Sequence, residues 1–247
     1  MSGVAAPGDR RAQLSAAVDT VRTRIETACQ AAGRSAREVE LVAVTKTYPA
    51  EDVALLLDLG LRQFGENRPQ EAAEKVVEVA RLRPTAARWH LVGRLQRNKA
   101  RSVAGWAARV ESVDSARLVD TLDREALRAV DNGDREGPLP VLLQVSLDGD
   151  PARGGTPSGE LLGLAERVGS TTGLRLDGVM AVAPLGGEPE RAFAQLAAEA
   201  ARLRHLFPHA RVISAGMTSD LERAIQYGST CVRVGTALLG DRRLASP

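Results

Sequence analysis

The sequence predicts an α/β fold: a single (β/α)8 barrel of the TIM type, preceded by one extra helix. Eight short runs are rich in β-branched and other apolar residues, and stretches with helical spacing separate them. The 247 residues are a usual length for one such barrel. A doubly wound open sheet uses the same alternation, but the strand count favours the closed barrel.

The first part of the chain predicts a mobile lead-in at residues 1–9 and then the extra helix. No periodic apolar pattern occurs before residue 10. From Arg11 to near Gly33, apolar residues recur at three- and four-residue spacing, which places on one helical face the side chains of Leu14, Val18, Val21, Ile25 and Cys29.

Residues 10–240, which include this helix, predict one barrel domain, and residues 241–247 predict a tail. We expect strands at 41–44, 62–64, 89–92, 109–112, 141–145, 176–180, 211–213 and 231–234. We expect helices between them at 51–59, 70–80, 97–103, 116–130, 159–168, 189–206 and 220–226. Residues 131–140, rich in Gly, Asp and Pro, predict a surface loop, and only a short turn is expected after the last strand.

Composition and charge narrow the classes of function. Hydrophobic residues at 44% are enough for a sizeable core, and a net charge of +2 with 3% aromatic residues argues against nucleic-acid binding. Cys29 and Cys231 lie far apart and predict buried apolar groups rather than a zinc site. The sequence lacks a signal-peptide pattern and an apolar run of membrane-spanning length, so we expect no membrane association and a cytoplasmic location.

Lys46 is the residue that most strongly indicates chemistry. It ends the first strand run, which places its amine at the carboxyl-terminal mouth where such barrels build their sites. The chain has only three lysines, Lys46, Lys75 and Lys99, against 30 arginines, and an arginine cannot form an imine. Spacing alone fits equally a lysine that only reaches solvent or pairs with an acid.

The other end of the barrel predicts an anion pocket. Gly235 and Thr236 follow the eighth strand, and the seventh strand leads into Ser214, Gly216, Met217 and Thr218. Loops after the last two strands of such barrels are a frequent phosphate site, although each Gly-Ser-Thr cluster taken alone is also typical of a turn. Arg233 is expected to alternate into the barrel.

Two inner segments add further candidates. Asn67 closes the second strand and is placed to hydrogen-bond a ligand ring, and His90 in the third strand is placed to face the interior. For His90 an interior histidine with satisfied hydrogen bonds is favoured over a catalytic role. The glycine spacing of 235–240 resembles a P-loop, but Asp241 stands where the lysine belongs. The sequence contains neither the G-x-S-x-G motif of hydrolases nor the H-E-x-x-H motif of zinc proteases.

In these segments, the sequence resembles the pyridoxal phosphate homeostasis proteins, also called the YggS or PROSC family. The resemblance covers almost everything after the first helix. Its segments, in family order, are 41–46, 64–67 with Gln70 and Glu71, 89–93, 95–96 with Asn98 and Lys99, 178–180 with Pro184, and 214–240.

The resemblance implies the barrel of the alanine racemase N-terminal domain, a fold-type III fold for pyridoxal 5'-phosphate (PLP). It implies that Lys46 carries PLP as a covalent internal aldimine and that Arg233 lies at the cofactor ring. An arginine there disfavours protonation of the pyridine nitrogen and weakens the ring as an electron sink. The implied phosphate-binding residues are Ser214, Gly216, Met217, Thr218, Gly235 and Thr236; Asn67 and His90 complete the expected cofactor site.

The implied function is reversible storage or delivery of PLP without catalysis, with PLP-dependent apo-enzymes as candidate recipients and a monomer as the expected state. The alternatives are a PLP-dependent amino-acid racemase and a regulatory protein that reports cofactor status. Racemisation needs acid/base groups on both faces of the α-carbon, and Tyr48 and Tyr227 lie in the wrong segments for the second. Arg153 stands where many relatives have a lysine. Because an arginine stays protonated, it cannot form a second imine at this place.

Overall fold

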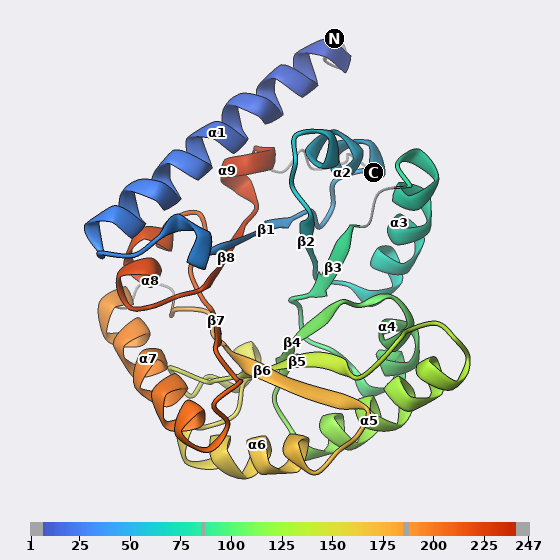
Figure 1. Ribbon diagram of the computed structural model, residues 1–247, viewed down its shortest axis with the longest axis vertical. Helices are drawn as coiled ribbons and strands as arrows, with labels where there is room; N and C mark the ends of the chain where they lie inside the picture. Colours follow the sequence, from blue (N-terminus) through green and yellow to red (C-terminus); the bar gives the residue numbers. More distant parts are fainter. Residues whose placement is uncertain (1–6, 85–86, 185–187, 241–247) are drawn as a thin grey trace.

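Eight parallel strands close into a barrel in chain order, β1 to β8, as the sequence predicted (Figure 1). The computed structural model describes residues 7–84, 87–184 and 188–240. The strands are β1 (Glu40–Val44), β2 (Gln63–Glu66), β3 (Arg88–Leu91), β4 (Arg109–Val113), β5 (Leu139–Gln144), β6 (Leu174–Met180), β7 (Val212–Ser214) and β8 (Cys231–Val234). The prediction of a (β/α)8 barrel is therefore confirmed.

Helices surround the barrel on the outside. They are α1 (Pro7–Ala31), α2 (Ala50–Asp58), α3 (Pro69–Leu82), α4 (Ala100–Trp106), α5 (Ala116–Asp131), α6 (Leu161–Gly169), α7 (Pro189–Leu206), α8 (Leu221–Gln226) and α9 (Thr236–Leu239). Within the described residues, four short 3-10 helices lie in the connections: η1 (Ala36–Glu38), η2 (Arg97–Lys99), η3 (Pro151–Arg153) and η4 (Ser158–Glu160). None of the described helices is long and apolar enough to cross a membrane.

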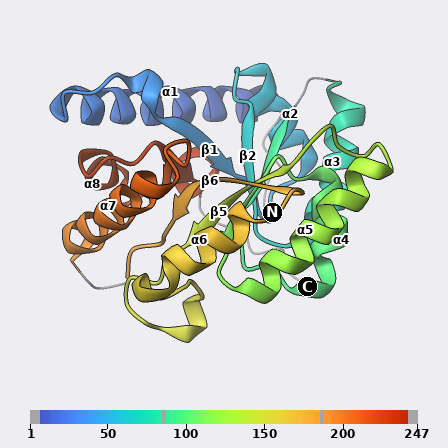
Figure 2. The ribbon, with the colours of Figure 1, turned by 60° about the horizontal axis from the view of Figure 1, so that its bottom comes forward.

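The extra helix α1 runs along the outside of the barrel beside α8 and α9 (Figures 1 and 2). All five side chains of its predicted apolar face are buried. They pack in one cluster with residues of α2, α8, α9 and the neighbouring strands. Helix α1 therefore covers the part of the barrel wall where the first strand, β1, pairs with the last, β8.

Element boundaries differ from the sequence prediction by up to a few residues, and three of the differences place regular structure in segments that were expected to have none. Helix α1 begins at Pro7, so part of the expected lead-in is helical; proline is tolerated in a first turn because the N–H it lacks has no partner there. Strand β5 begins at Leu139, inside the expected surface loop. A short helix, α9, replaces the expected turn after β8; four residues are too few to show a helical period. Residues 1–6 of the lead-in and the tail 241–247 lie outside the described residues.

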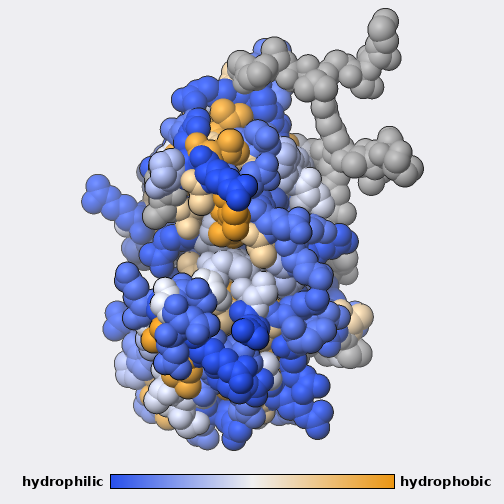
Figure 3. Space-filling view, turned by 90° about the vertical axis from the view of Figure 1, so that its right-hand side faces the viewer, coloured by the Kyte–Doolittle hydropathy of each residue, from blue (hydrophilic) through white to orange (hydrophobic). Residues whose placement is uncertain are grey.

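The face of the molecule that lies on the right of Figure 1 is largely hydrophilic, with apolar side chains gathered in a narrow band (Figure 3). Over the described residues, the large apolar side chains that remain exposed are Val77 and Leu82 on α3, Leu127 and Val130 on α5, and Leu206 on α7. Most apolar surface is thus buried between the strands and the helices.

Candidate functional site

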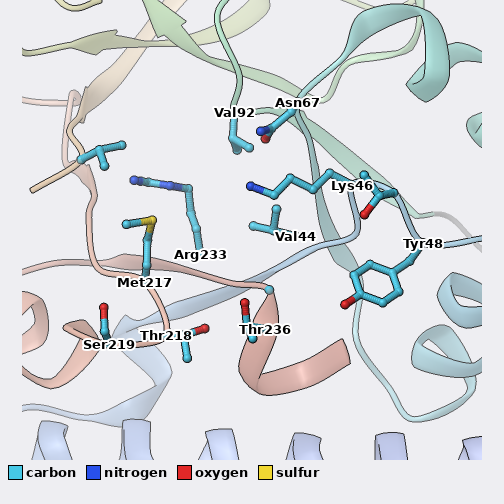
Figure 4. A pocket seen from close by; sticks show the side chains of 13 residues that line it. Val44, Lys46, Tyr48, Asn67, Val92, Met217, Thr218, Ser219, Arg233 and Thr236 are labelled. Carbon is cyan, nitrogen blue, oxygen red and sulfur yellow. The ribbon is translucent and has the colours of Figure 1, made fainter. Parts of the chain in front are cut away.

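A cavity of about 460 Å3 opens where β1, β2, β3, β6, β7 and β8 end (Figure 4). Seven of the ten residues predicted for the site line it: Lys46, Asn67, Met217, Thr218, Arg233, Gly235 and Thr236. Six further lining residues were not among the predicted ten: Val44, Thr47, Tyr48, Val92, Val182 and Ser219. Val44 had a signal in the sequence, since it ends the predicted strand 41–44 two residues before Lys46.

Lys46 extends into this cavity from the loop that follows β1 (Figure 4). The residue after it, Thr47, has a φ of +66°. This is a left-handed conformation that a β-branched residue rarely adopts, and such strain is concentrated at functional sites. The backbone thus turns sharply directly after Lys46, before helix α2 begins at Ala50.

The residue before the lysine, Thr45, is held on several sides. Its N–H donates to the carbonyl of Gly65 (3.0 Å) and its hydroxyl donates to Oε1 of Glu66 (2.7 Å). Its own carbonyl accepts a hydrogen bond from Nζ of Lys75 (2.8 Å), which also pairs with Oε1 of Glu66 (2.7 Å). The half-buried Lys75 and the buried Glu66 therefore fix the strand end that presents Lys46, a role that the sequence pattern did not indicate.

Tyr48 lies beside the cavity on the same loop as Lys46 (Figure 4). Its hydroxyl donates a hydrogen bond to the carbonyl of Gly240, at 2.6 Å. This bond ties the loop after β1 to the end of α9. Lys46 and Tyr48 thus approach the cavity from one loop rather than from opposite sides.

Hydroxyl groups gather on the side of the cavity formed by the loops after β7 and β8. Thr218, Ser219 and Thr236 lie there, with the backbone of Gly235 between β8 and α9 (Figure 4). The hydroxyl of Thr218 accepts a hydrogen bond from the N–H of Ala237 (3.3 Å), which joins the two loops. A hydroxyl that accepts one hydrogen bond retains its proton for another partner.

Two glycines shape the backbone around the cavity. Gly216 has a φ of +92°, and a Cβ there would lie only 2.6 Å from the Cβ of Ala224, so the loop after β7 needs a glycine to pack on α8. A Cβ on Gly93 would lie 2.3 Å from the carbonyl oxygen of Asn67. The loops after β2 and β3 touch at that point, and this contact sets the place of Asn67.

Arg233 is buried and forms part of the floor of the cavity. Its Nη1 donates to Oγ of Ser214 (2.6 Å), and its Nη2 donates to the carbonyl of Ala181 (2.8 Å). Two strand ends, β6 and β7, therefore hold the guanidinium in place. The prediction that Arg233 points into the barrel is confirmed.

Three predicted residues do not line the cavity. Ser214 lies under Arg233, and Gly216 acts on the backbone of its loop. His90 lies in the barrel interior: its Nδ1 is 2.7 Å from Oε1 of Glu111 and its Nε2 is 2.9 Å from Oε1 of Gln63. Both ring nitrogens of His90 therefore have partners within the barrel, and the structure shows His90 in the interior position that the sequence favoured.

Glu111 is the buried acid that the sequence reasoning missed. Its Oε1 faces His90, and its Oε2 accepts a hydrogen bond from Ser214 (2.6 Å). Burial opposes ionisation, but the hydrogen bond and charge of His90, the charge of Arg233 and the Ser214 hydroxyl together lower the pKa of Glu111 from 4.5 to about 2. Glu111 is therefore ionised at neutral pH, and its pairing across the barrel left no local pattern in the sequence.

The cavity fits a small anionic aldehyde. Two cationic side chains, Lys46 and Arg233, line it, and none of the thirteen lining residues is acidic. Its volume lies within the range of pockets that enclose small cofactors, about 300 to 1,000 Å3. PLP has an aldehyde, a pyridine ring and a phosphate. The primary amine can react with the aldehyde, the buried guanidinium can donate to the ring, and the hydroxyls beside a glycine can donate to the phosphate.

Known proteins resemble this chain over most of its length. The profile of the alanine racemase N-terminal domain matches residues 17–243. The pyridoxal phosphate homeostasis protein of Mycobacterium tuberculosis is 49% identical over 249 residues, which cover 97% of this chain and 96% of that protein. The chain belongs to the pyridoxal phosphate homeostasis protein family. The family member of Escherichia coli K12 is 40% identical over 226 residues, covering 90% of this chain and 94% of that protein.

A solved structure shows a relative with a ligand. PipY of Synechococcus elongatus, with PLP bound, matches this chain with a TM-score of 0.78 and 33% identity, covering 92% of this chain and 100% of that one. The likeness extends over nearly the whole barrel. The fold predicted from the family resemblance is confirmed by this match.

Proposed function

We propose that this chain binds PLP covalently through Lys46 and holds it reversibly, as a PLP homeostasis protein rather than as a catalyst. The observation that carries the proposal is one cavity that contains the amine of Lys46, the buried guanidinium of Arg233 and three hydroxyls beside Gly235. The names of the relatives and the PLP bound to PipY support it.

The residues of the cavity have separable roles in this proposal. Bound PLP supplies an aldehyde carbon for a primary amine and a pyridine ring that withdraws electrons. Nζ of Lys46, as a neutral amine, would be the group that condenses with this aldehyde, with the aldehyde oxygen released as water, and hydrolysis would free the amine and the aldehyde again. Thr218, Ser219 and Thr236 would hold the phosphate, and Arg233 would donate to the ring. Asn67 would bind a ring substituent.

The arrangement favours holding over racemisation. A racemase needs a second acid/base group facing Lys46 across the substrate α-carbon. Tyr48 approaches from the same loop as Lys46, and its hydroxyl donates to the carbonyl of Gly240. We therefore expect no exchange of the α-proton of alanine for deuterium above the rate with free PLP, measured by proton NMR; faster exchange would restore the racemase alternative.

Arg153 lies in the loop after β5, and an arginine there cannot form a second imine, which is consistent with Lys46 as the imine-forming residue. Its Nη2 donates to the carbonyls of Val182 and Ala183, at 2.9 and 2.7 Å, so it ties the loop after β5 to the end of β6. We propose that PLP leaves by hydrolysis at Lys46 and passes to PLP-dependent apo-enzymes, and that the chain acts as a cytoplasmic monomer. The two cysteines, Cys29 and Cys231, are free buried thiols, as a reducing compartment allows.

A titration of the purified protein with PLP tests the proposal. We expect an absorption band of a PLP imine at one equivalent, and we expect Lys46→Ala to abolish it. Lys99→Ala is the matched control, because Lys99 lies on η2 and does not line the cavity. A band that persists at full strength in Lys46→Ala, or that disappears in Lys99→Ala alone, would contradict the assignment of Lys46.

A further inference from the structure

Five polar side chains in the barrel interior are joined end to end by hydrogen bonds. The chain runs from Arg233 to Ser214 (2.6 Å), to Glu111 (2.6 Å), to His90 (2.7 Å) and to Gln63 (2.9 Å). These residues belong to β8, β7, β4, β3 and β2. Because β4 is not a neighbour of β7 in the barrel, the bond between Glu111 and Ser214 crosses the barrel interior.

The directions of the three hydrogen bonds between Arg233 and His90 follow from the ionised state of Glu111. A carboxylate only accepts, so Oγ of Ser214 donates to Oε2 of Glu111 and Nδ1 of His90 donates to Oε1. The Ser214 oxygen is then left to accept the hydrogen bond from Nη1 of Arg233. The charge of Glu111 therefore orients the serine toward the arginine.

This charge is placed to act on the cavity from outside it. Glu111 is fully buried and does not line the cavity, and its Oε2 lies 4.0 Å from Nη1 of Arg233. A buried carboxylate is costly unless it is paired and hydrogen-bonded, and here its partners are His90, Ser214 and Arg233. The second support of the guanidinium is the carbonyl of Ala181. With only that carbonyl, the guanidinium plane would be free to turn.

We propose that Glu111 is the positioning residue of Arg233: acting through Ser214, it fixes the guanidinium that meets the cofactor ring, and His90 and Gln63 fix Glu111 in turn. The proposal rests on the PLP-binding function proposed above. Glu111 does not touch the ligand in this arrangement, so its effect on PLP passes through Arg233 alone.

A double-mutant cycle with PLP tests this dependence. We expect Glu111→Gln to weaken PLP binding about tenfold, and we expect the double variant Glu111→Gln with Arg233→Gln to bind no more weakly than Arg233→Gln alone. The absorption maximum of PLP bound to Glu111→Gln should shift toward that of Arg233→Gln. A loss of packing alone would not reproduce the spectrum of the arginine variant.

Glu125→Gln is the matched control. Glu125 is a buried carboxylate on α5, paired with Arg124 and Arg128 outside the barrel, and its loss should leave PLP affinity and spectrum unchanged. Ser214→Ala keeps the carboxylate and removes the bridge, so it tests the same claim if Glu111→Gln fails to fold. We expect the same weakening from it, again absent when Arg233 is already glutamine.

Two results would overturn the inference. One is an additive loss in the double variant, and the other is affinity and spectrum like those of the unaltered chain in both Glu111→Gln and Ser214→Ala. A failure of the unaltered chain to take up PLP is a different result, because it contradicts the proposed function before any variant is compared.

Discussion

At the scale of single residues, two cations in the cavity are held in different ways. Lys46 extends from a strained turn that Thr45 and the Lys75–Glu66 pair anchor. Arg233 extends from within β8 and is held by Ser214 and Ala181. The lysine is thus presented by a loop, and the arginine is part of the rigid barrel wall.

Arg233→Gln tests the contribution of the guanidinium. Glutamine retains one donor group but loses the charge, and hydrogen bonds from a charged donor are about twice as strong as neutral ones. We expect PLP affinity to fall about tenfold in an equilibrium titration, with the imine to Lys46 still formed. Unchanged affinity would show that Arg233 lies away from the ligand.

The low pKa of Glu111 predicts how the free energy of unfolding changes at acid pH. Its folded pKa of about 2 lies below the ordinary value of 4.5, so its contribution to stability is present above pH 4.5 and is lost as the pH falls toward 2. The gap in free energy of unfolding between the unaltered chain and Glu111→Gln should shrink over this range by about 3 kcal/mol. Urea unfolding at a series of pH values measures the gap, and a constant gap would contradict the low pKa.

Single residues also show where sequence reasoning succeeds and fails. Lys46 and Arg233 were predictable because strand alternation and strand ends place side chains at the mouth of a barrel. Glu111 and Tyr48 were not, because their roles depend on partners far along the chain, Ser214 and Gly240. His90 was placed correctly in the interior, but its absence from the lining of the cavity was not predictable, since the pattern cannot show which depth of the barrel a side chain reaches.

At the scale of elements, the extra helix α1 supports the loops after β7 and β8, on the side of the cavity where the hydroxyls gather. Arg24 on α1 donates from Nη2 to the carbonyl of Thr218 (2.8 Å) and from Nε to Oε1 of Glu222 on α8 (2.6 Å). Arg10 donates to the carbonyl of Leu239 at the end of α9 (3.1 Å). A helix outside the eight-fold repeat therefore fixes the loops after β7 and β8.

Arg24→Ala tests this support. We expect PLP affinity to fall about two- to fivefold, as suits a half-buried ion pair with one further hydrogen bond. Arg22→Ala is the control, because Arg22 lies on the same helix and reaches the carbonyl of Leu59 instead. Equal effects of both variants in the PLP titration would show that α1 acts only as general support.

The elements were largely predictable because helices and strands carry their own periodicity. All eight strands and the seven helices between them occur at the predicted places, within a few residues. The start of α1 and the whole of α9 were missed. Neither segment has an apolar spacing of its own, and α9 packs against α1, more than 200 residues earlier.

At the scale of the whole molecule, closure of the barrel creates the site. Lining residues come from the first and last strands and from loops between them, and the β1–β8 pairing brings the ends of the sheet together. Closure also sets Glu111 opposite Ser214. The fold class was therefore enough to place the cavity, whereas the buried polar network needed the three-dimensional structure.

Borohydride reduction of the protein with PLP, followed by intact mass measurement and peptide mapping, tests most directly whether Lys46 holds the cofactor. The central claim predicts one phosphopyridoxyl group per chain, attached to Lys46, with Lys75 and Lys99 unmodified. Reduction that leaves Lys46 unmodified, or that places the group on either of the other two lysines, would contradict it.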